Sequence, residues 1–540
     1  MNSGFSPTNT VVHSTKMLCF VFVFLNIAPF NPLAFAHDGM HLLRVKIEGT
    51  RDRAARVSIV DDVGVFIAPT GAVLRKTNRD IKYFYADGEF SVAVPESVRM
   101  TIAAGLESVP QTVSIRANAE TDLTVKLGSW IDMASRGWYS GDSHVHLHTG
   151  GPISASTSDA ILAARAEGLN YVNLCVSNNL GDDIRGQELI TGAAHPHSNN
   201  RHLLVFGEEI RSSIYGHMQF FGIKKFVEPQ YTGFDKTPNS LDFPANFKMA
   251  KETCDQGGVV TYGHPMLKNA PDAFAGDLAA GNGAARELPI DLVHGAVHAM
   301  DIMSYNSDEV LSSQLWYQLL NCGFKISACV GTDALLDNST EPMGGSRVYV
   351  KTKGEFNQAT WQEGLKLGRT LVTNGPIAWL TVNDQEIGST CELASEGSVR
   401  VRTSVDSLVP INVVEVVVNG EVARSLDVQP ATSDSAQHLQ WDVEIPLAKS
   451  SWIALRVRGP DDPRVFDGPA WAHTSPVYVL LSGKPIANKS DAQYFVGWID
   501  QMLRVVAIRN RYPSSQDREA VESIFRKAQD YYAKMAKSGD

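Results

Sequence analysis

Three histidines and an aspartate alternate along one short stretch, Gly141-Asp142-Ser143-His144-Val145-His146-Leu147-His148. In an extended strand, side chains two residues apart point to the same face, so these four polar groups would share one face. Imidazoles and a carboxylate side by side are costly in a dry core, but they are good ligands for zinc and related ions. The alternative is a surface strand that is rich in histidine. The stretch therefore predicts a strand that presents a metal site.

The bulk properties predict several domains. A chain of 540 residues is too long for one ordinary domain. Its composition, 44% hydrophobic and 20% charged, is typical of a soluble globular protein. The net charge of -11 argues against nucleic-acid binding that depends on bulk electrostatics. We expect a small-molecule partner and no nucleic acid, while the oligomeric state is left open.

Residues 1–36 resemble a secretory signal. Lys16 precedes an almost wholly apolar run at 17–27, and the small-x-small sequence Ala34-Phe35-Ala36 follows. The alternative is an uncleaved anchor, but the run is shorter than the ~20 residues that a membrane span needs. No later segment is long enough to span a membrane. The sequence therefore predicts an exported protein, periplasmic or secreted.

The remaining chain changes pattern three times. Residues 37–129 alternate in short strands and predict a β-sandwich accessory domain. Residues 130–378 alternate between strands and helices, which is typical of a parallel barrel or a wound sheet. Residues 379–485 read as a second β-sandwich domain, and residues 486–540 carry helical periodicity.

Polar residues recur where the strands of the central region end. These candidates are His144, His146, Glu209, His217, His264 and Asp333. Each has an ordinary alternative: His264 could be a packed loop histidine, Asp333 a helix N-cap, and Glu208 competes with its neighbour Glu209. As a set at successive strand ends they predict one site, because barrels hold their sites at the carboxyl ends of strands.

The ordered motifs resemble those of the PHP superfamily, named for polymerase and histidinol phosphatase domains. The resemblance rests on four motifs: His144-x-His146 after Gly-Asp, Gly207-Glu208-Glu209-Ile210 with Gly216-His217, Gly263-His264-Pro265, and Gly331-Thr332-Asp333. The segment 368–376, running into a β-domain, looks like the carbaryl-hydrolase branch. The resemblance implies a distorted (β/α)7 barrel, flanked by the amino-terminal β-sandwich and by the carboxyl-terminal β-sandwich with terminal helices.

The same resemblance implies a binuclear metal site. One ion would take His144, His146 and Asp333, and Glu209 would bridge to a second ion held by His217 and His264. Zinc is expected, with manganese or iron as alternatives. Where the family usually has Asp-His and a later histidine for a third ion, this chain has Ser177-Asn178 and Leu335. We therefore expect two metals rather than three.

These observations predict a hydrolase that acts on an ester, carbamate or phosphoester bond through a metal-activated water. Glu209 and Asp333 are the expected catalytic ligands, and Arg347 and Arg369 could steady an anion or form surface ion pairs. His148 and His298 are reserve ligands. The alternative function is a non-catalytic exported polymer-binding protein with structural metals.

Asp142 stands two residues before His144 on the same strand face. It is the expected acceptor for the ring N–H of a metal-bound His144. The alternative is that Asp142 shapes the turn after Gly141.

Overall fold

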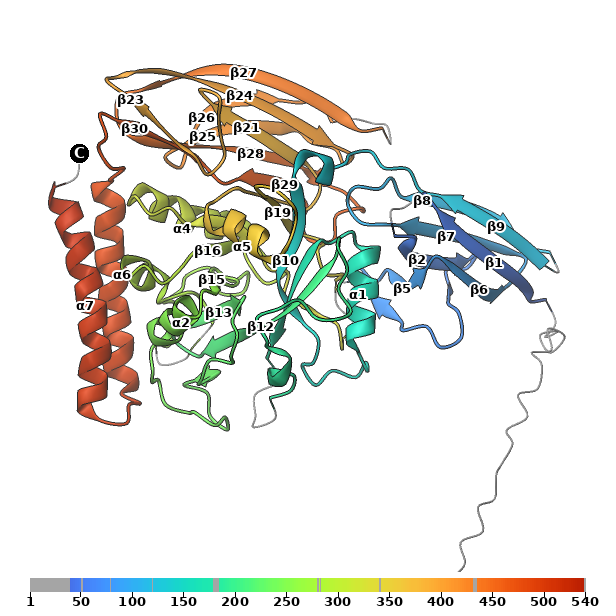
Figure 1. Ribbon diagram of the computed structural model, residues 1–540, viewed down its shortest axis with the longest axis horizontal. Coiled ribbons are helices and arrows are strands. Elements are labelled where there is room, and N and C mark those ends of the chain that lie inside the picture. The colour runs from blue at the N-terminus through green and yellow to red at the C-terminus, as the bar shows by residue number, and fades with distance from the viewer. Residues whose placement is uncertain are drawn as a thin grey trace, which may run out of the picture.

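The computed structural model describes residues 39–49, 52–77, 79–118, 120–177, 184–278, 281, 283–338, 341–430 and 435–538. The signal peptide expected at residues 1–36 lies outside these ranges. Figure 1 shows amino-terminal sheets at one end, a central part with most of the shorter helices, carboxyl-terminal sheets beside it, and a long helix pair at the other end. The protein is thus multidomain and mostly β, as expected. No helix within the described ranges has the length and apolar character needed to cross a membrane.

The amino-terminal part consists of two packed sheets with a core of their own. Its strands are β1 (His41–Glu48), β2 (Ala54–Asp61), β3 (Phe66–Ile67), β4 (Arg75–Lys76), β5 (Lys82–Asp87), β6 (Glu89–Val94), β7 (Ser97–Ala103), β8 (Gln111–Arg116) and β9 (Glu120–Lys126). One sheet has the order β6-β1-β9 and the other β4-β5-β2-β7-β8. Val57 and Ile59 enter the core, while Arg56 and Ser58 on the same strand are partly exposed.

The central part begins with parallel strands and helices. Its elements are η2 (Ala134–Arg136), β10 (Trp138–His146), α1 (Thr157–Ala166), β11 (Tyr171–Val176), η3 (Gln187–Leu189), β12 (Leu203–Ser212), β13 (Gly216–Phe221), β14 (Tyr231–Thr232), α2 (Asn246–Asp255), β15 (Val259–Tyr262), α3 (Leu288–Val293), β16 (Ala299–Met303), α4 (Glu309–Asn321), β17 (Ser327–Val330), β18 (Ala334–Leu335), β19 (Arg347–Lys351), α5 (Gln358–Lys366) and β20 (Thr370–Thr373). β10, β11 and β12 pair in parallel, as do β15, β16 and β17. β13 runs antiparallel between β12 and β15, which interrupts the expected alternation of strand and helix.

The two ends of this central sheet meet without forming a ladder. The hydroxyl of Ser143 in β10 donates to the carbonyl of Val330 in β17 at 2.9 Å, and the N–H of Asp333 donates to the carbonyl of His144 at 2.8 Å. β10 pairs instead with β18 and β19. No ladder joins β10 to β17 in the described ranges, so the sheet is not closed. The (β/α)7 barrel that the resemblance implies therefore stays a prediction.

Local sequence explains how helix α1 starts. Ser156 caps it, because its hydroxyl accepts the backbone N–H of Asp159 while the Asp159 carboxylate accepts the N–H of Ser156. Gly168 follows the helix with φ +64°, a conformation that glycine adopts at low cost. The helix therefore runs from Thr157 to Ala166 between a serine cap and a glycine.

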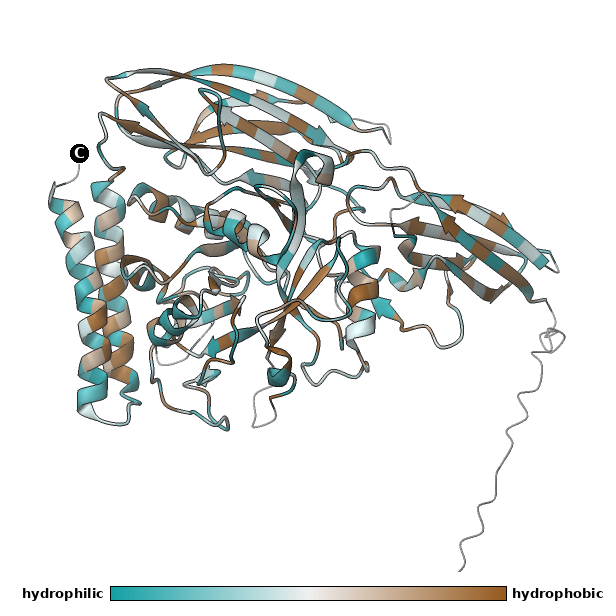
Figure 2. Cartoon of the chain, viewed as in Figure 1, coloured by the Kyte–Doolittle hydropathy of each residue, from teal (hydrophilic) through white to brown (hydrophobic). Residues whose placement is uncertain are grey.

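Some strands of the carboxyl-terminal part continue the central sheet, and the others form a four-stranded sheet of their own. Its strands are β21 (Ile377–Val382), β22 (Gln385–Glu386), β23 (Thr390–Leu393), β24 (Gly397–Ser407), β25 (Val413–Val418), β26 (Glu421–Asp427), β27 (Gln437–Leu447), β28 (Ser451–Asp461), β29 (Pro469–Thr474) and β30 (Val477–Leu481). β20 pairs with β29, so hydrogen bonding runs from one part into the next. Trp452 of β28 shares one apolar cluster with Trp316 of α4. Along the outer strand β27, Figure 2 shows the alternation of polar and apolar residues.

Two long helices, α6 (Lys489–Arg509) and α7 (Ser515–Ser538), pack on the central part. The buried hydroxyl of Tyr532 donates to the carbonyl of Pro289 at 2.8 Å. The guanidinium of Arg509 contacts the buried carboxylate of Asp242 at 2.7 Å. The helix pair is therefore fixed to the central part by a buried apolar face and by directional bonds.

One carboxylate joins two strands of the carboxyl-terminal sheet. Glu415 of β25 accepts from Arg456 of β28 at 2.7 Å and from Arg458 at 2.9 Å. Burial tends to raise the pKa of Glu415, but the two guanidinium groups outweigh it and hold that pKa below its ordinary value. The ion pair is therefore a pH-dependent contribution to stability.

We predict that Glu415→Gln lowers the free energy of unfolding by about 1–3 kcal/mol at neutral pH, because the two guanidinium groups lose their charged partner. A carboxylate with a depressed folded-state pKa stabilises above its unfolded pKa, and the contribution is lost as the pH falls through the folded pKa. The difference from wild type in denaturant unfolding should therefore shrink below about pH 4. Glu421→Gln, an exposed control on β26, should match wild type. A difference independent of pH would contradict the prediction.

Candidate metal centre

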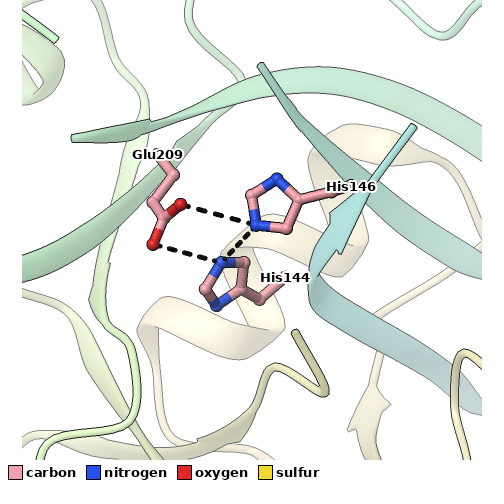
Figure 3. Close-up of side chains that lie close together, drawn as sticks. All are labelled: His144, His146 and Glu209. Carbon is pink, nitrogen blue, oxygen red and sulfur yellow. Dashed lines mark hydrogen bonds and ion pairs between the residues drawn. The ribbon is translucent and has the colours of Figure 1, made fainter. Parts of the chain in front are cut away.

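The alternation in β10 places two imidazoles on one buried face. His144 and His146 are both 0% exposed, and their Nε2 atoms lie 2.9 Å apart. Figure 3 shows both rings turned toward Glu209. Two ring nitrogens at this distance need a proton or a cation between them, because two lone pairs facing each other repel. The strand thus builds the start of a cation site.

The hairpin of β12 and β13 supplies the opposite wall. Glu209 is the cross-strand partner of Gln219, and Arg211 is the partner of His217, so all four share one face. Oε1 of Glu209 lies 3.1 Å from Nδ1 of His217, and Oε2 accepts from Nε of Arg211 at 2.7 Å. Extending β12 to Ser212 is what brings these residues into one ladder.

Glu208 points away from this face. Its Oε2 accepts the backbone N–H of Val227 at 2.9 Å, and burial raises the pKa of its carboxyl well above the ordinary value. The two adjacent glutamates therefore lie in different surroundings, as the pleat of an extended strand requires. Of these two glutamates, Glu209 is the one that contacts the imidazoles.

His264 and Asp333 enter the cluster from left-handed backbone positions. Their φ angles are 30° and 62°, in a region that residues other than glycine seldom adopt. Oδ1 of Asp333 lies 3.1 Å from Nε2 of His146, and Nε2 of His264 lies 3.9 Å from Oε1 of Glu209. Such strain persists where the surroundings impose it, and it concentrates at functional sites.

The six candidate residues fall into three overlapping groups whose ligand atoms lie within 4.8 Å of one another. The groups are His144, His146 and Glu209; His144, His264 and Asp333; and Glu209, His217 and His264. Ligands about 2.0–2.2 Å from one tetrahedral zinc ion lie roughly 3.3 Å apart. The observed separations from 2.9 to 3.4 Å around His144 and His146 suit such an ion. This cluster could hold metal ions.

One oxygen fits a metal ligand better than a hydrogen-bond acceptor. Oε1 of Glu209 is buried and accepts no hydrogen bond, although imidazoles of His144 and His217 lie 3.4 and 3.1 Å away. A buried carboxylate oxygen without a partner is costly. A cation between this oxygen and the ring nitrogens would remove that cost, so the residues fit the metals that the sequence predicts.

The carboxylates dominate the electrostatics of the cluster. Burial lowers the pKa of His144, but Asp333 and Glu209 outweigh it and raise that pKa to about 9. Burial opposes ionisation of Glu209, yet Arg211 and His144 hold its pKa well below the ordinary value. Burial lowers the pKa of His217 to about 4. Without any metal, the side chains of the cluster thus favour a charged Glu209 and a protonated His144.

Gln219 lies behind His144. Its Nε2 lies 3.1 Å from Nδ1 of His144, and its Oε1 accepts from the hydroxyl of Thr261 at 2.9 Å. If Nε2 of His144 binds a metal, Nδ1 carries the proton, and rotating the amide by 180° would let Oε1 accept it. A Cβ at Gly263 would lie 2.1 Å from Nε2 of Gln219, so glycine is required for this close approach.

Asp142 does not contact the ring of His144, which corrects the sequence expectation. Its carboxylate accepts the backbone N–H groups of His144, Thr332 and Gly344 at 3.2, 3.0 and 2.9 Å, and the hydroxyl of Thr332 at 2.5 Å. It therefore ties β10 to the loop before Asp333, which is closer to the turn-shaping alternative. The Nδ1 side of His144 is occupied by Gln219 instead, and the pairing of β10 with β11 shifts register between residues 142 and 145.

Sequence reasoning also missed two residues beside the cluster. Nδ2 of Asn306 donates to Oδ2 of Asp333 at 2.6 Å. The carboxyl of Asp301 is buried next to His144, where a Cβ on Gly331 would lie 2.4 Å from either residue, and burial raises the pKa of Asp301 to about 7. Asn306 follows β16, so the rule of strand ends would have found it, whereas Asp301 lies in the middle of β16.

The two arginines expected at the site lie elsewhere. Arg347 is buried and donates to the backbone carbonyls of Gly344 and Glu167 at 2.8 and 3.0 Å. Arg369 lies 3.7 Å from Glu363. No contact joins either arginine to the six candidate ligands in the described part of the chain. Arg211 is the arginine that the fold brings to the cluster, and it lies two residues after Glu209 on the same face.

The reserve histidines do not join the three groups. His298 lies at the amino end of β16, where its Nδ1 accepts the N–H of Val260 at 3.1 Å. His148 follows β10 and is partly exposed. Neither belongs to a ligand group among the described residues.

Two of the positions where the family usually holds a third metal have residues that are poor metal ligands in this chain. Ser177 is buried, and Leu335 pairs with His146 in the sheet. Asn178 lies outside the described residues. The count of two metals stays a prediction.

We predict that Asp142→Asn lowers the free energy of unfolding by about 1–3 kcal/mol, because its amide N–H₂ would face donors. Denaturant unfolding followed by tryptophan fluorescence measures the change. Asp122→Asn, an exposed control, should stay within about 0.5 kcal/mol of wild type. A wild-type midpoint for Asp142→Asn would show that these hydrogen bonds do not hold β10 in place.

No family model and no curated protein matches the chain. Among solved structures, PsfC from Pseudomonas syringae PB-5123 has 14% identity and a TM-score of 0.27, over 42% of this chain and 88% of that chain. The lesion-specific endonuclease PfuEndoQ from Pyrococcus furiosus has 11% identity and a TM-score of 0.27, over 42% of this chain and 56% of that chain. At such TM-scores the likeness carries neither fold nor function to this chain, so any functional conclusion rests on the site.

Proposed function

We propose that this protein is an exported metal-dependent hydrolase whose ligands are the six residues of the cluster. The observation that carries the proposal is the position of Glu209, which belongs to two ligand groups at once. Its Oε1 lies 3.4 Å from His144, 3.1 Å from His217 and 3.9 Å from His264, and its Oε2 lies 3.4 Å from His146. A carboxylate that four imidazoles approach is suited to holding two ions.

The ligand chemistry supports divalent ions that accept nitrogen and oxygen donors. Four imidazoles and two carboxylates favour zinc, with manganese or iron as alternatives. When bound, such ions lower the pKa of a water and polarise a carbonyl or phosphoryl oxygen. The resemblance of the motifs to the PHP superfamily, and to its carbaryl-hydrolase branch, suggests an ester, carbamate or phosphoester as substrate.

The chain's own residues have distinct tasks in this proposal. Gln219 orients the ring of His144, and Asn306 orients the carboxylate of Asp333. Arg211 neutralises Oε2 of Glu209 and fixes its rotamer. Asp333 holds a left-handed backbone conformation, and its Oδ1 lies 3.1 Å from Nε2 of His146.

We expect about two metal ions per chain in the purified protein, because the proposed assignment divides the six ligands into two sets that share Glu209. Elemental analysis before and after dialysis against a chelator measures this. His217→Ala should retain about one ion, since only one set loses a ligand. His438→Ala, an exposed histidine of the carboxyl-terminal part, should retain both. Three ions per chain, or activity without metal, would refute the two-metal proposal.

We expect Glu209→Gln to lower turnover by on the order of 10²-fold or more, because both ions lose a charged ligand. Glu208→Gln should be nearly silent, since the raised pKa of Glu208 already favours a neutral group and a glutamine can still accept the N–H of Val227. The assay uses aryl carbamates, aryl esters and bis-aryl phosphodiesters, with metal content checked in each variant.

The same assay separates catalysis from the alternative function. A wild-type protein that holds two ions but turns over no substrate of the panel would favour structural metals. An inactive Glu208→Gln with an active Glu209→Gln would show that the wrong glutamate has been assigned.

A further inference from the structure

A large groove lies between the amino-terminal sheet and the carboxyl-terminal part, separate from the six ligands. Its volume is about 910 Å³, at the upper end of the range for ligand pockets. Its floor is the face of β2, β7 and β8 turned away from the amino-terminal core. Its wall comes from the segment between β28 and β29, with Pro463, Arg464 and Phe466. Two parts of the chain that are distant in sequence thus build one binding surface.

The floor carries a row of hydroxyl groups. Ser58 of β2 is the cross-strand partner of Thr101 of β7, and Thr101 is the partner of Thr112 of β8. Neighbouring strands lie roughly 5 Å apart, so the row extends for roughly 10 Å. The hydroxyls of Thr101 and Thr112 lie 3.1 Å apart. Each can both donate and accept, which suits the hydroxyls of a sugar.

Cations flank this row on both sides. Arg99 lies two residues from Thr101 on β7, at one side of the row. Arg56 lies two residues from Ser58 on β2, at the other side of the row. Lys82 and Arg464 also line the groove, and Asp80 is the acidic residue of the lining. Asp80 pairs with Lys76 at 3.0 Å. Such a local excess of positive charge contrasts with the net charge of -11 for the chain.

Two of these cations are available to a ligand. Arg56 is held by Glu167 at 2.7 Å and Arg464 by Asp462 at 2.8 Å. Lys82 and Arg99 are exposed, and neither forms an ion pair within the described ranges. A guanidinium and an ammonium beside a row of hydroxyls are suited to carboxylates on a hydroxylated ligand.

The aromatic residues of the lining argue against nucleic acid. Base stacking needs an accessible ring face. The ring of Phe466 is covered by the guanidinium of Arg56, 4.4 Å from its centroid, and Tyr83 is 1% exposed. Phe66 packs against the amino-terminal core. The groove thus offers hydroxyls and cations rather than stacking platforms.

We propose that this groove binds an acidic oligosaccharide, a chain of sugars that carry carboxylates. The row of hydroxyls contacts the sugar hydroxyls, and Arg99 and Lys82 bind the carboxylates. The length of the row and the volume of the groove suit an oligomer rather than a single sugar. This inference does not depend on the proposed hydrolase, because the groove and the six ligands share no residue.

Isothermal titration of the full chain with an oligogalacturonate of defined length tests the proposal. The double variant Arg99→Gln/Lys82→Gln should bind about tenfold more weakly or worse, as expected for the loss of charge-assisted hydrogen bonds. Thr101→Val, which keeps shape but removes one hydroxyl, should also weaken binding. The matched control Arg116→Gln/Lys126→Gln loses the same two charges at exposed positions outside the groove and should bind like wild type.

Three further measurements decide the ligand class. The methyl-esterified oligomer should bind much more weakly, and binding should persist in excess chelator, which separates this result from the metal centre. A single-stranded oligonucleotide that binds as tightly as the uronate would overturn the proposal in favour of nucleic acid. It would likewise be overturned by equal binding of the esterified oligomer, by a double variant that binds like wild type, or by no saturable binding.

Discussion

The structure depends on holding several ionisable groups together in its interior. His144, His146 and Glu209 are all 0% exposed, and burying such groups without compensation is expensive. The central sheet supplies that compensation from several sides: Arg211 on the carboxylate, Gln219 behind one imidazole, and a backbone carbonyl at Cys175 behind the other. The atoms that face the middle of the cluster keep an unfavourable burial energy, and a cation would be stabilised most at that point. The side chains and carbonyls that surround the cluster therefore have to be polar and accurately placed.

Much of this arrangement could be predicted from the sequence, because it follows from the period of a strand. The alternation in β10 places His144 and His146 on one face, and the same pleat separates Glu209 from Glu208. The strands at both ends of the central part and the two long carboxyl-terminal helices follow in the same way from the apolar periodicity of their own residues. These features are local, so neighbouring residues suffice to determine them.

What could not be predicted depends on pairing between distant strands. The hairpin of β12 and β13 brings Arg211 and Gln219 to the site, and no local pattern announces this pairing. Arg347 has the charge of a site residue, but its side chain is directed to the carbonyls of Gly344 and Glu167. A charge near a motif in sequence does not reveal which face of the sheet it occupies. Closure of the barrel is likewise a matter of long-range register, and the described pairings leave the sheet open.

The left-handed backbone at His264 and Asp333 also limits how this site could change during evolution. Among residues other than glycine, that conformation is adopted most readily by asparagine, aspartate and histidine, and β-branched or bulky residues resist it. A mutation to cysteine or glutamate would have to overcome backbone strain before its ligand chemistry could be selected. The main chain therefore keeps nitrogen and oxygen donors at these two positions and disfavours a drift toward thiolate ligands and the soft metals they select.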